Sequence, residues 1–124
     1  MEKSEVFFRT DGCIRLAKSG LSSSDFRVFM ALASVIDKDN YFSMTVGARK
    51  KLALRLGVTP RTVYDSLGRL IKKDLIAKDE WGEYMMNPEI VHKTYPMRLG
   101  SLMIEYREIK RSSNNKIEED EKEN

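Results

Sequence analysis

The chain has 124 residues, a net charge of +3 and 41% hydrophobic residues, which fits one globular domain with a modest core. Its single cysteine, Cys13, excludes an internal disulfide and favours a reducing cytoplasm. With only one histidine, His92, beside that cysteine, the sequence predicts no metal site. It contains no apolar run long enough to span a membrane.

The charge is unevenly distributed along the chain. Residues 49–73 hold eight Lys or Arg against one acid, a net charge of +7, whereas residues 112–124 hold two Lys against five acids, a net charge of −3. A basic segment of this kind is attracted to a phosphate backbone. A solvated basic face is the alternative interpretation of such a run taken alone.

The first 22 residues are interpreted as an N-terminal extension. Val6-Phe7-Phe8 predicts a short strand or an arm that packs on the core. Asp11-Gly12 indicates a turn or a helix N-cap. Residues 12–19 fit either a short helix that ends near Gly20 or the return strand of a hairpin, and we favour the helix.

Residues 23–37 predict a helix that is buried over much of its circumference. Ser22 and Asp25 have the spacing of a capping box. Residues 37–40 are expected to form a polar turn, and residues 41–44 a short strand. One apolar face of the helix is formed by Phe26, Phe29, Met30, Ala33 and Ile36.

The segment that follows has the capping and turn residues that are typical of a helix-turn-helix. Thr45 is placed to cap a first helix over residues 46–56. Ala53 is small where two helices must cross, and Gly57 can take the positive φ of the turn.

A second helix is predicted over residues 60–73. Thr59 is a good N-cap, and Pro60 falls at the first helical position, where a missing N–H costs nothing. The helix has one apolar stripe, which is formed by Val63, Leu67 and Leu70. Its opposite face is mostly basic, so it can lie in the DNA major groove.

A β-hairpin is predicted directly after the second helix. Residues 75–78 and 83–87 form its strands, with Gly82 in the tight turn and Pro88 ending the second strand. Strand 41–44 is a candidate third strand.

The rest of the chain is expected to be a C-terminal extension with one helix. Residues 89–96 are predicted to be irregular, residues 97–111 helical, and residues 112–124 a disordered acidic tail. The helix has an apolar stripe that packs on the chain's own core or on a second copy, and we favour a homodimer. The stripe consists of Leu99, Leu102, Met103, Tyr106 and Ile109.

Residues 23–87 resemble the winged helix-turn-helix superfamily. The sharpest match lies between residues 45 and 76, with Leu-Gly-Val-Thr at the turn, Thr-Val inside the second helix and Leu-Ile-Lys-Lys-Asp-Leu-Ile leading into the hairpin. The resemblance implies an α+β, mainly α fold, with a winged helix-turn-helix over residues 23–88 followed by a C-terminal helix. Winged helices serve several biological roles, so the fold alone does not select one.

Two further segments resemble the RepL-type plasmid replication proteins of Gram-positive bacteria. They are Asp-Lys-Asp-Asn-Tyr before the helix-turn-helix and Glu-Tyr-Met-Met-Asn-Pro-Glu-Ile after the hairpin. Such proteins are thought to bind their own origin and to recruit host replication machinery. The resemblance therefore implies that this chain does the same.

The candidate site is a double-stranded DNA interface. Arg61 and Thr62 lie at the start of the second helix. Arg61 can donate hydrogen bonds to guanine O6 and N7, or it can contact only a phosphate. Asp65 can accept from cytosine N4 or pair with Arg61 or Arg69, and we favour the pairing. The candidate DNA-binding residues are Arg49, Lys50, Arg55, Thr59, Arg61, Thr62, Tyr64, Asp65, Arg69, Lys72, Lys73, Lys78 and Trp81.

Two residues allow alternative interpretations. Gly68, in the middle of the second helix, either permits a close approach to DNA or is a neutral surface glycine. Trp81, at the hairpin tip, can enter a minor groove, pack on a sugar or fold back onto the hairpin.

The predicted function is sequence-specific binding of double-stranded DNA, with plasmid replication initiation at an origin preferred. Transcriptional repression is the alternative, and a winged helix used only for protein interaction is disfavoured by the basic reading segment. The paired acids lie at an exposed turn and in the tail rather than in a cleft, and no Gly-rich phosphate loop is present, so no enzyme activity and no cofactor are predicted. Expected partners are DNA, a second copy of the chain and host replication proteins.

Overall fold

The computed structural model describes residues 5–93 and 98–122, with the side chains of the last helix described as far as Ser113. The predicted start of the last helix at residue 97 and the end of the predicted irregular segment lie outside the described residues. The described fold is α+β and mainly helical, which confirms the predicted fold class.

The N-terminal extension packs against the domain's core through the partly buried side chains of Val6, Phe8, Leu16 and Leu21. Strand β1 (Phe7–Phe8) pairs antiparallel with β5 (Val91–His92), so the prediction that residues 89–96 are irregular is wrong for that pair. Helix α1 (Thr10–Lys18) confirms the favoured helix over residues 12–19.

Gly12 lies inside α1 rather than in a turn before it. A Cβ added at Gly12 would lie 2.5 Å from the Cα atom of Ile90, so only glycine allows α1 to approach the chain this closely. The sequence alone could not show that contact, because Ile90 is far from Gly12 along the chain.

Helix α2 (Ser23–Ala33) begins where its cap predicts and ends earlier than the predicted residue 37. The Ser22 hydroxyl accepts from the Asp25 N–H at 3.1 Å. After Ser34 the chain turns, and the Asp37 carboxylate accepts from the backbone N–H groups of Asp39 and Tyr41 at 2.8 and 2.9 Å. Because this local turn satisfies the backbone, the helix does not continue.

Helices α3 (Val46–Leu56) and α4 (Pro60–Lys72) have the predicted bounds to within one residue. The Thr45 hydroxyl caps α3 by accepting from the Ala48 N–H. Gly57 ends α3 at φ 70°, in the left-handed region, as predicted. The two helices pack against each other at the buried Ala53.

A three-stranded antiparallel sheet has the strand order β2–β4–β3. Its strands are β2 (Tyr41–Phe42), β3 (Ile76–Lys78) and β4 (Tyr84–Met86). The predicted hairpin and its third strand are therefore confirmed, with Tyr41 opposite Met85.

Two asparagine side chains link the sheet to neighbouring segments by hydrogen bonds to the backbone. The Asn40 side-chain amide donates to the carbonyl oxygens of Met86 and Val91, at 3.2 and 2.8 Å. The Asn87 amide donates to the Asp74 carbonyl, and its own oxygen accepts from the Glu89 N–H. The two asparagines belong to the segments that resemble RepL-type proteins, so in this chain those segments hold the sheet in place.

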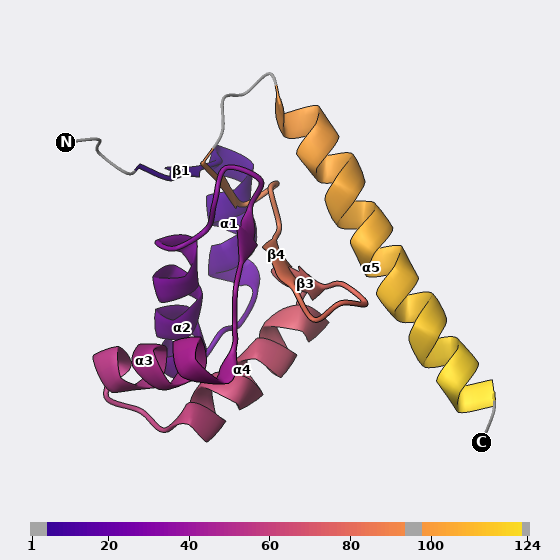
Figure 1. Ribbon diagram of the computed structural model, residues 1–124. Helices are drawn as coiled ribbons and strands as arrows, with labels where there is room; N and C mark the ends of the chain where they lie inside the picture. The colour runs from indigo at the N-terminus through magenta and orange to yellow at the C-terminus, as the bar shows by residue number, and fades with distance from the viewer. Residues whose placement is uncertain (1–4, 94–97, 123–124) are drawn as a thin grey trace.

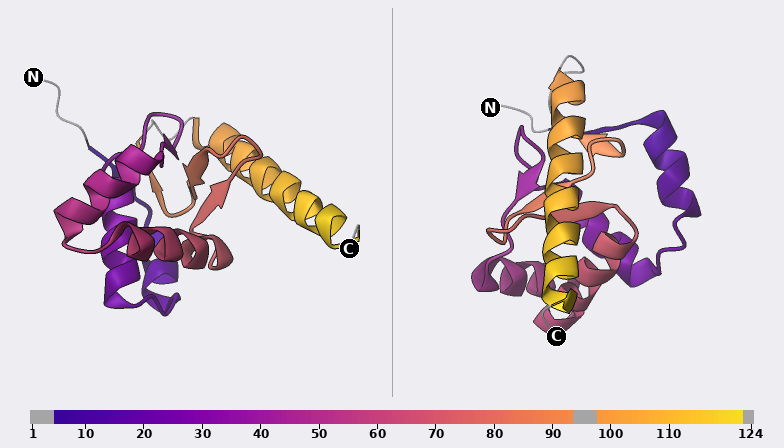
Figure 2. Two further views of the ribbon diagram at one scale, coloured as in Figure 1. Left: turned by 60° about the horizontal axis from the view of Figure 1, so that its bottom comes forward. Right: turned by 90° about the vertical axis from the view of Figure 1, so that its right-hand side faces the viewer.

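Helix α5 (Leu99–Lys122) covers the face of the sheet opposite α1–α4 (Figures 1 and 2). Leu102 and Tyr106 are buried there against Ala77 and Met85. The apolar stripe thus packs on the chain's own core, which corrects the alternative that it packs on a second copy.

The last helix is longer than predicted. Residues 112–122, expected to be disordered, continue α5, and residues 123–124 lie outside the described part. No Pro or Gly interrupts the chain from Ser101 to Lys122, and its Glu and Lys residues favour helix.

Within residues 5–93 and 98–122, no helix combines the length and apolar character that a membrane span requires.

Candidate nucleic-acid interface

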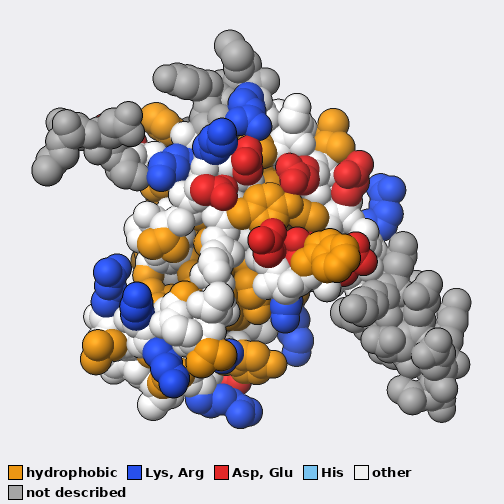
Figure 3. All heavy atoms as spheres, viewed as in Figure 1, with side chains coloured by type: hydrophobic (Ala, Val, Ile, Leu, Met, Phe, Trp, Pro, Cys, Tyr) orange, Lys and Arg blue, Asp and Glu red, His pale blue; other side chains and the backbone are white. Residues whose placement is uncertain are grey.

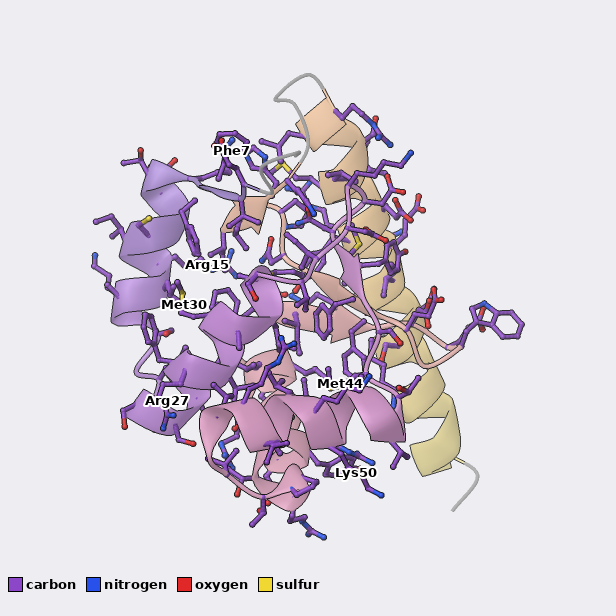
Figure 4. All side chains as sticks on the ribbon, turned by 60° about the vertical axis from the view of Figure 1, so that its left-hand side comes forward. Phe7, Arg15, Arg27, Met30, Met44 and Lys50 are labelled. Carbon is purple, nitrogen blue, oxygen red and sulfur yellow. The ribbon has the colours of Figure 1, made fainter. Side chains whose placement is uncertain are left out.

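The exposed surface of α3 and α4 carries most of the candidate DNA-binding side chains. Figure 3 shows Lys and Arg side chains over this lower part of the molecule, whereas most of the acidic side chains in this view lie in the upper part, together with further Lys and Arg side chains. Lys50 points away from the body of the protein on the outer side of α3 (Figure 4). We call the exposed surface of these two helices the basic face; it includes Arg49, Lys50, Arg61 and Lys72.

The beginning of α4 lies within the basic face. The Thr59 hydroxyl accepts from the Thr62 N–H at 3.2 Å and lies 2.9 Å from the Thr62 hydroxyl. Thr59 therefore acts as the predicted cap, and the cap is exposed. The positive end of the helix dipole faces solvent at this point, where an anion would be stabilised.

A shallow hollow of ≈ 370 Å³ lies beside this helix start, lined by Arg49, Pro60, Arg61 and Tyr64. The Arg49 guanidinium lies 5.3 Å from the centre of the Tyr64 ring, which orients this long side chain. Tyr64 is 55% exposed. The hollow thus joins two guanidinium groups and one aromatic ring from two helices.

Arg61 is paired with Asp65, as favoured from the sequence. The Arg61 Nε lies 3.2 Å from the Asp65 carboxylate, and the Arg61 side chain is 82% exposed. An exposed pair of this kind contributes about 0.3–0.5 kcal/mol to stability. Since the restraint is this weak, Arg61 can exchange the carboxylate for a base edge or a phosphate.

Arg69, one of the predicted DNA-binding residues, is half-exposed and is engaged within the protein by the buried Asp25. Its Nε and Nη2 donate to the Asp25 carboxylate at 2.7 and 2.9 Å, and the Ser66 hydroxyl donates to the same carboxylate at 2.6 Å. The Arg69 guanidinium, helped by Ser66, holds the pKa of the buried Asp25 below its usual value, although burial acts in the opposite direction. The network joins α2 to α4.

The basic residues at the end of α4 differ from one another. Lys72 is exposed and free to meet a phosphate, as far as the described residues show. Lys73 donates from Nζ to the carbonyl oxygen of Ser19 at 2.6 Å and so holds the end of α1. Arg55 lies at the other end of the basic face, on the rim of an apolar groove between α2 and α3.

The hairpin carries a basic residue on one side and lies beside acidic residues on the other. Lys78 lies over the Tyr84 ring at 5.5 Å, on the side that faces the helical core. Trp81 is 82% exposed at the tip and lines a groove shared with the acidic residues Asp79, Glu105 and Glu108. These acids would repel a phosphate backbone, which argues against the predicted contact of Trp81 with DNA.

Two features of this surface were not predicted. Asp25 was interpreted only as part of a capping box, because nothing local indicates its contact with Arg69. The contact of the α5 acids with the sheet was not predicted either: the hydroxyl of Tyr41, in β2, donates to Glu105 at 2.8 Å. Burial and the neighbouring Glu105 raise the pKa of Tyr41, with smaller contributions from Asp79 and Glu83.

Comparison with known proteins identifies a family that matches this chain. The family of Firmicute plasmid replication proteins, RepL, matches residues 23–124, which include the helix-turn-helix, the sheet and α5. No curated protein and no solved structure matches the chain. The match covers well over half of the sequence and agrees with the resemblance of the segments that contain Asn40 and Asn87. The chain therefore belongs to the RepL family of Firmicute plasmid replication proteins.

Proposed function

We propose that this plasmid replication protein binds double-stranded DNA at an origin through the basic face of α3 and α4, and that this binding initiates replication. The observation that carries the proposal is the exposed start of α4, where Arg61, the Thr59 cap and the Arg49–Tyr64 pair surround one hollow. In a winged helix-turn-helix, this end of the second helix lies nearest the base edges.

The residues of the basic face divide into two roles. Arg61 leaves Asp65 and donates to guanine O6 and N7, while Thr62 lies beside it at the same end of the helix. Arg49, Lys50 and Lys72 contact phosphates and fix the orientation of the helix. Lys78 extends the positive surface onto the hairpin.

The molecule acts by binding, without catalysis and without a cofactor. We propose that two copies bind together, because a two-fold protein reads a palindromic site with two reading helices. A cytoplasmic location agrees with the single free cysteine, Cys13. Host replication proteins are the partners that an initiator needs after it has bound.

The salt dependence of binding tests the DNA interface. Each phosphate contact releases counterions, so the plot of log affinity against log salt should have a slope of about −0.9 per contact. Fluorescence anisotropy with duplex DNA from the flanking region measures the slope. Binding that is absent at low salt, or that does not change with salt, would exclude this interface.

A replication assay tests the biological role. The coding sequence and its flanking DNA are placed on a fragment without another origin, and maintenance is scored in a permissive host. We expect maintenance that is lost with Arg61→Ala and retained with Asp11→Asn. If the intact fragment is not maintained while a reporter behind the gene's own upstream region is silenced, repression replaces initiation as the function.

A further inference from the structure

A groove between the hairpin tip and α5 combines an exposed indole with a surface of negative charge. Its volume is ≈ 380 Å³, and its walls include Trp81 and Glu80 from the hairpin and Glu108 and Ile109 from α5. Among the described residues, no Lys or Arg lines it. Figure 3 shows acidic side chains around hydrophobic ones on this face of the molecule.

The turn that carries the indole is ordered by its own hydrogen bonds. The Asp79 carboxylate accepts from the backbone N–H groups of Trp81 and Glu83, at 2.9 and 2.8 Å. Gly82 takes φ 86°, a conformation that other residues rarely adopt. The turn is thus ordered by internal hydrogen bonds, and it presents a large apolar side chain to solvent without a core to cover it.

Among the side chains that the structure describes, the carboxylates around the indole have no cationic partner. No ion pair among the described residues includes Glu80, Glu83 or Glu108. Glu105 is held at the groove by the Tyr41 hydroxyl. This contrasts with the other side of α5, where Lys110 pairs with Asp74 and Arg107 with Glu89.

We propose that this groove binds an arginine-rich segment of a protein partner. A guanidinium is attracted to the face of an indole and donates to carboxylates at the same time, so one side chain uses both features of the groove. The acids repel DNA, so the groove is free for a protein while the basic face holds the duplex. The inference goes beyond DNA binding and can fail or succeed independently of it.

Titration with a model peptide tests the groove directly. Trp81 is the only tryptophan in the chain, so its fluorescence reports on this groove alone. We expect an octa-arginine peptide to change that fluorescence saturably in the full chain, and an octa-glutamate peptide to leave it unchanged. No saturable change with octa-arginine would overturn the proposal.

Matched variants separate the groove from general attraction to acids. Glu80→Gln with Glu108→Gln should weaken peptide binding by about tenfold, whereas Glu5→Gln with Asp11→Asn, which removes the same charge from other exposed positions, should have little effect. Trp81→Ala, measured by calorimetry, should weaken binding by about two- to fivefold. Equal losses in the two double variants would overturn the proposal.

Two further outcomes would assign the groove to another occupant. If Trp81→Ala weakens duplex DNA binding as much as Lys50→Ala does, the groove belongs to the DNA interface. If Trp81→Ala converts a dimer into a monomer in light scattering, a second copy of the chain occupies it. Either result would contradict an arginine-rich protein partner, and unchanged DNA binding and oligomeric state would support it.

Discussion

Arg61 and Lys50 are both exposed and basic, yet their positions predict different effects. Arg61 lies at the start of α4, beside the hollow, whereas Lys50 lies on the outer side of α3. In the proposed DNA interface, Arg61 contacts a base and Lys50 contacts a phosphate. The distinction depends on geometry, because the two charges are equal.

Arg61→Ala should reduce discrimination between the cognate and a scrambled duplex by about 1–3 kcal/mol, because a bidentate contact to guanine is lost. Lys50→Ala should weaken both duplexes by similar amounts. Competition anisotropy with the two duplexes measures both effects. If Arg61→Ala also weakens both duplexes equally, Arg61 contacts only phosphate.

Asp25 joins α2 to α4 through its hydrogen bonds with Ser66 and Arg69. Asp25→Asn should lower the free energy of unfolding at neutral pH by about 2–3 kcal/mol, because the half-exposed Arg69 loses a buried charged partner. Urea denaturation monitored by circular dichroism measures the loss. Asp65→Asn is the matched control, and we expect its effect to be within about 0.5 kcal/mol because that pair is exposed.

The same residue gives the stability a pH dependence. The pKa of Asp25 is lowered in the folded chain, so its contribution is complete above the usual value of 3.8 and is lost as the pH falls through the folded value. The difference in stability between the wild type and Asp25→Asn should therefore shrink below about pH 4. A constant difference down to low pH would contradict the ion pair.

At the scale of the element, α4 contains a glycine that its helix does not require. A Cβ added at Gly68 would meet no atom within 4 Å. Gly68→Ala should therefore stabilise the chain by about 0.5–1 kcal/mol through helix propensity. Thermal unfolding measures that gain.

DNA affinity then decides between the two interpretations of Gly68. If α4 approaches the duplex closely at this position, Gly68→Ala will weaken binding while it raises stability. Unchanged affinity identifies a neutral surface glycine. We expect weaker binding, because the glycine lies on the exposed side of α4.

Helix α5 is held by Asp74, which lies two residues after the end of α4. Asp74 takes φ 60° and accepts from the Tyr106 hydroxyl at 2.9 Å, while its carboxylate also pairs with Lys110 and Arg15. Burial, followed by the charge of Asp74, raises the pKa of Tyr106. One carboxylate thus joins α1 and α5 to the end of α4.

Asp74→Asn should loosen α5 without distorting the turn, because asparagine tolerates the left-handed conformation. We expect a loss of about 1–2 kcal/mol in stability, with faster amide hydrogen exchange in α5 than in α3. Tyr106→Phe is the control that removes one hydroxyl and keeps the packing. Unchanged exchange in α5 would show that the apolar contacts suffice.

At the scale of the molecule, the proposed dimer must use a surface other than the buried stripe of α5. Phe26 and Met30 lie one turn apart on α2 and are 44% and 37% exposed. We expect the full chain to scatter light as a dimer at micromolar concentration, and Met30→Lys to shift it towards the monomer. A monomeric wild-type chain would contradict the proposal.

Local signals in the sequence predicted the helix-turn-helix formed by α3 and α4. Thr45 and Thr59 cap their helices, Gly57 supplies the turn, and the stripe that contains Val63 and Leu67 orients α4. Each signal acts over a few residues, because a cap, a turn and an amphipathic stripe are satisfied by their neighbours along the chain. Periodicity could also place a helix after residue 97, although not how far it continues.

Only the tertiary structure decided which basic and acidic side chains remain available to a partner. Arg69 and Lys73 look like DNA contacts in the sequence, but Asp25 and the carbonyl of Ser19 engage them from distant segments. The acids of α5 meet Trp81 only because the helix packs on the sheet. A charge is available for binding when no buried or neighbouring group has already paired with it, and that pairing depends on contacts between residues far apart in the chain.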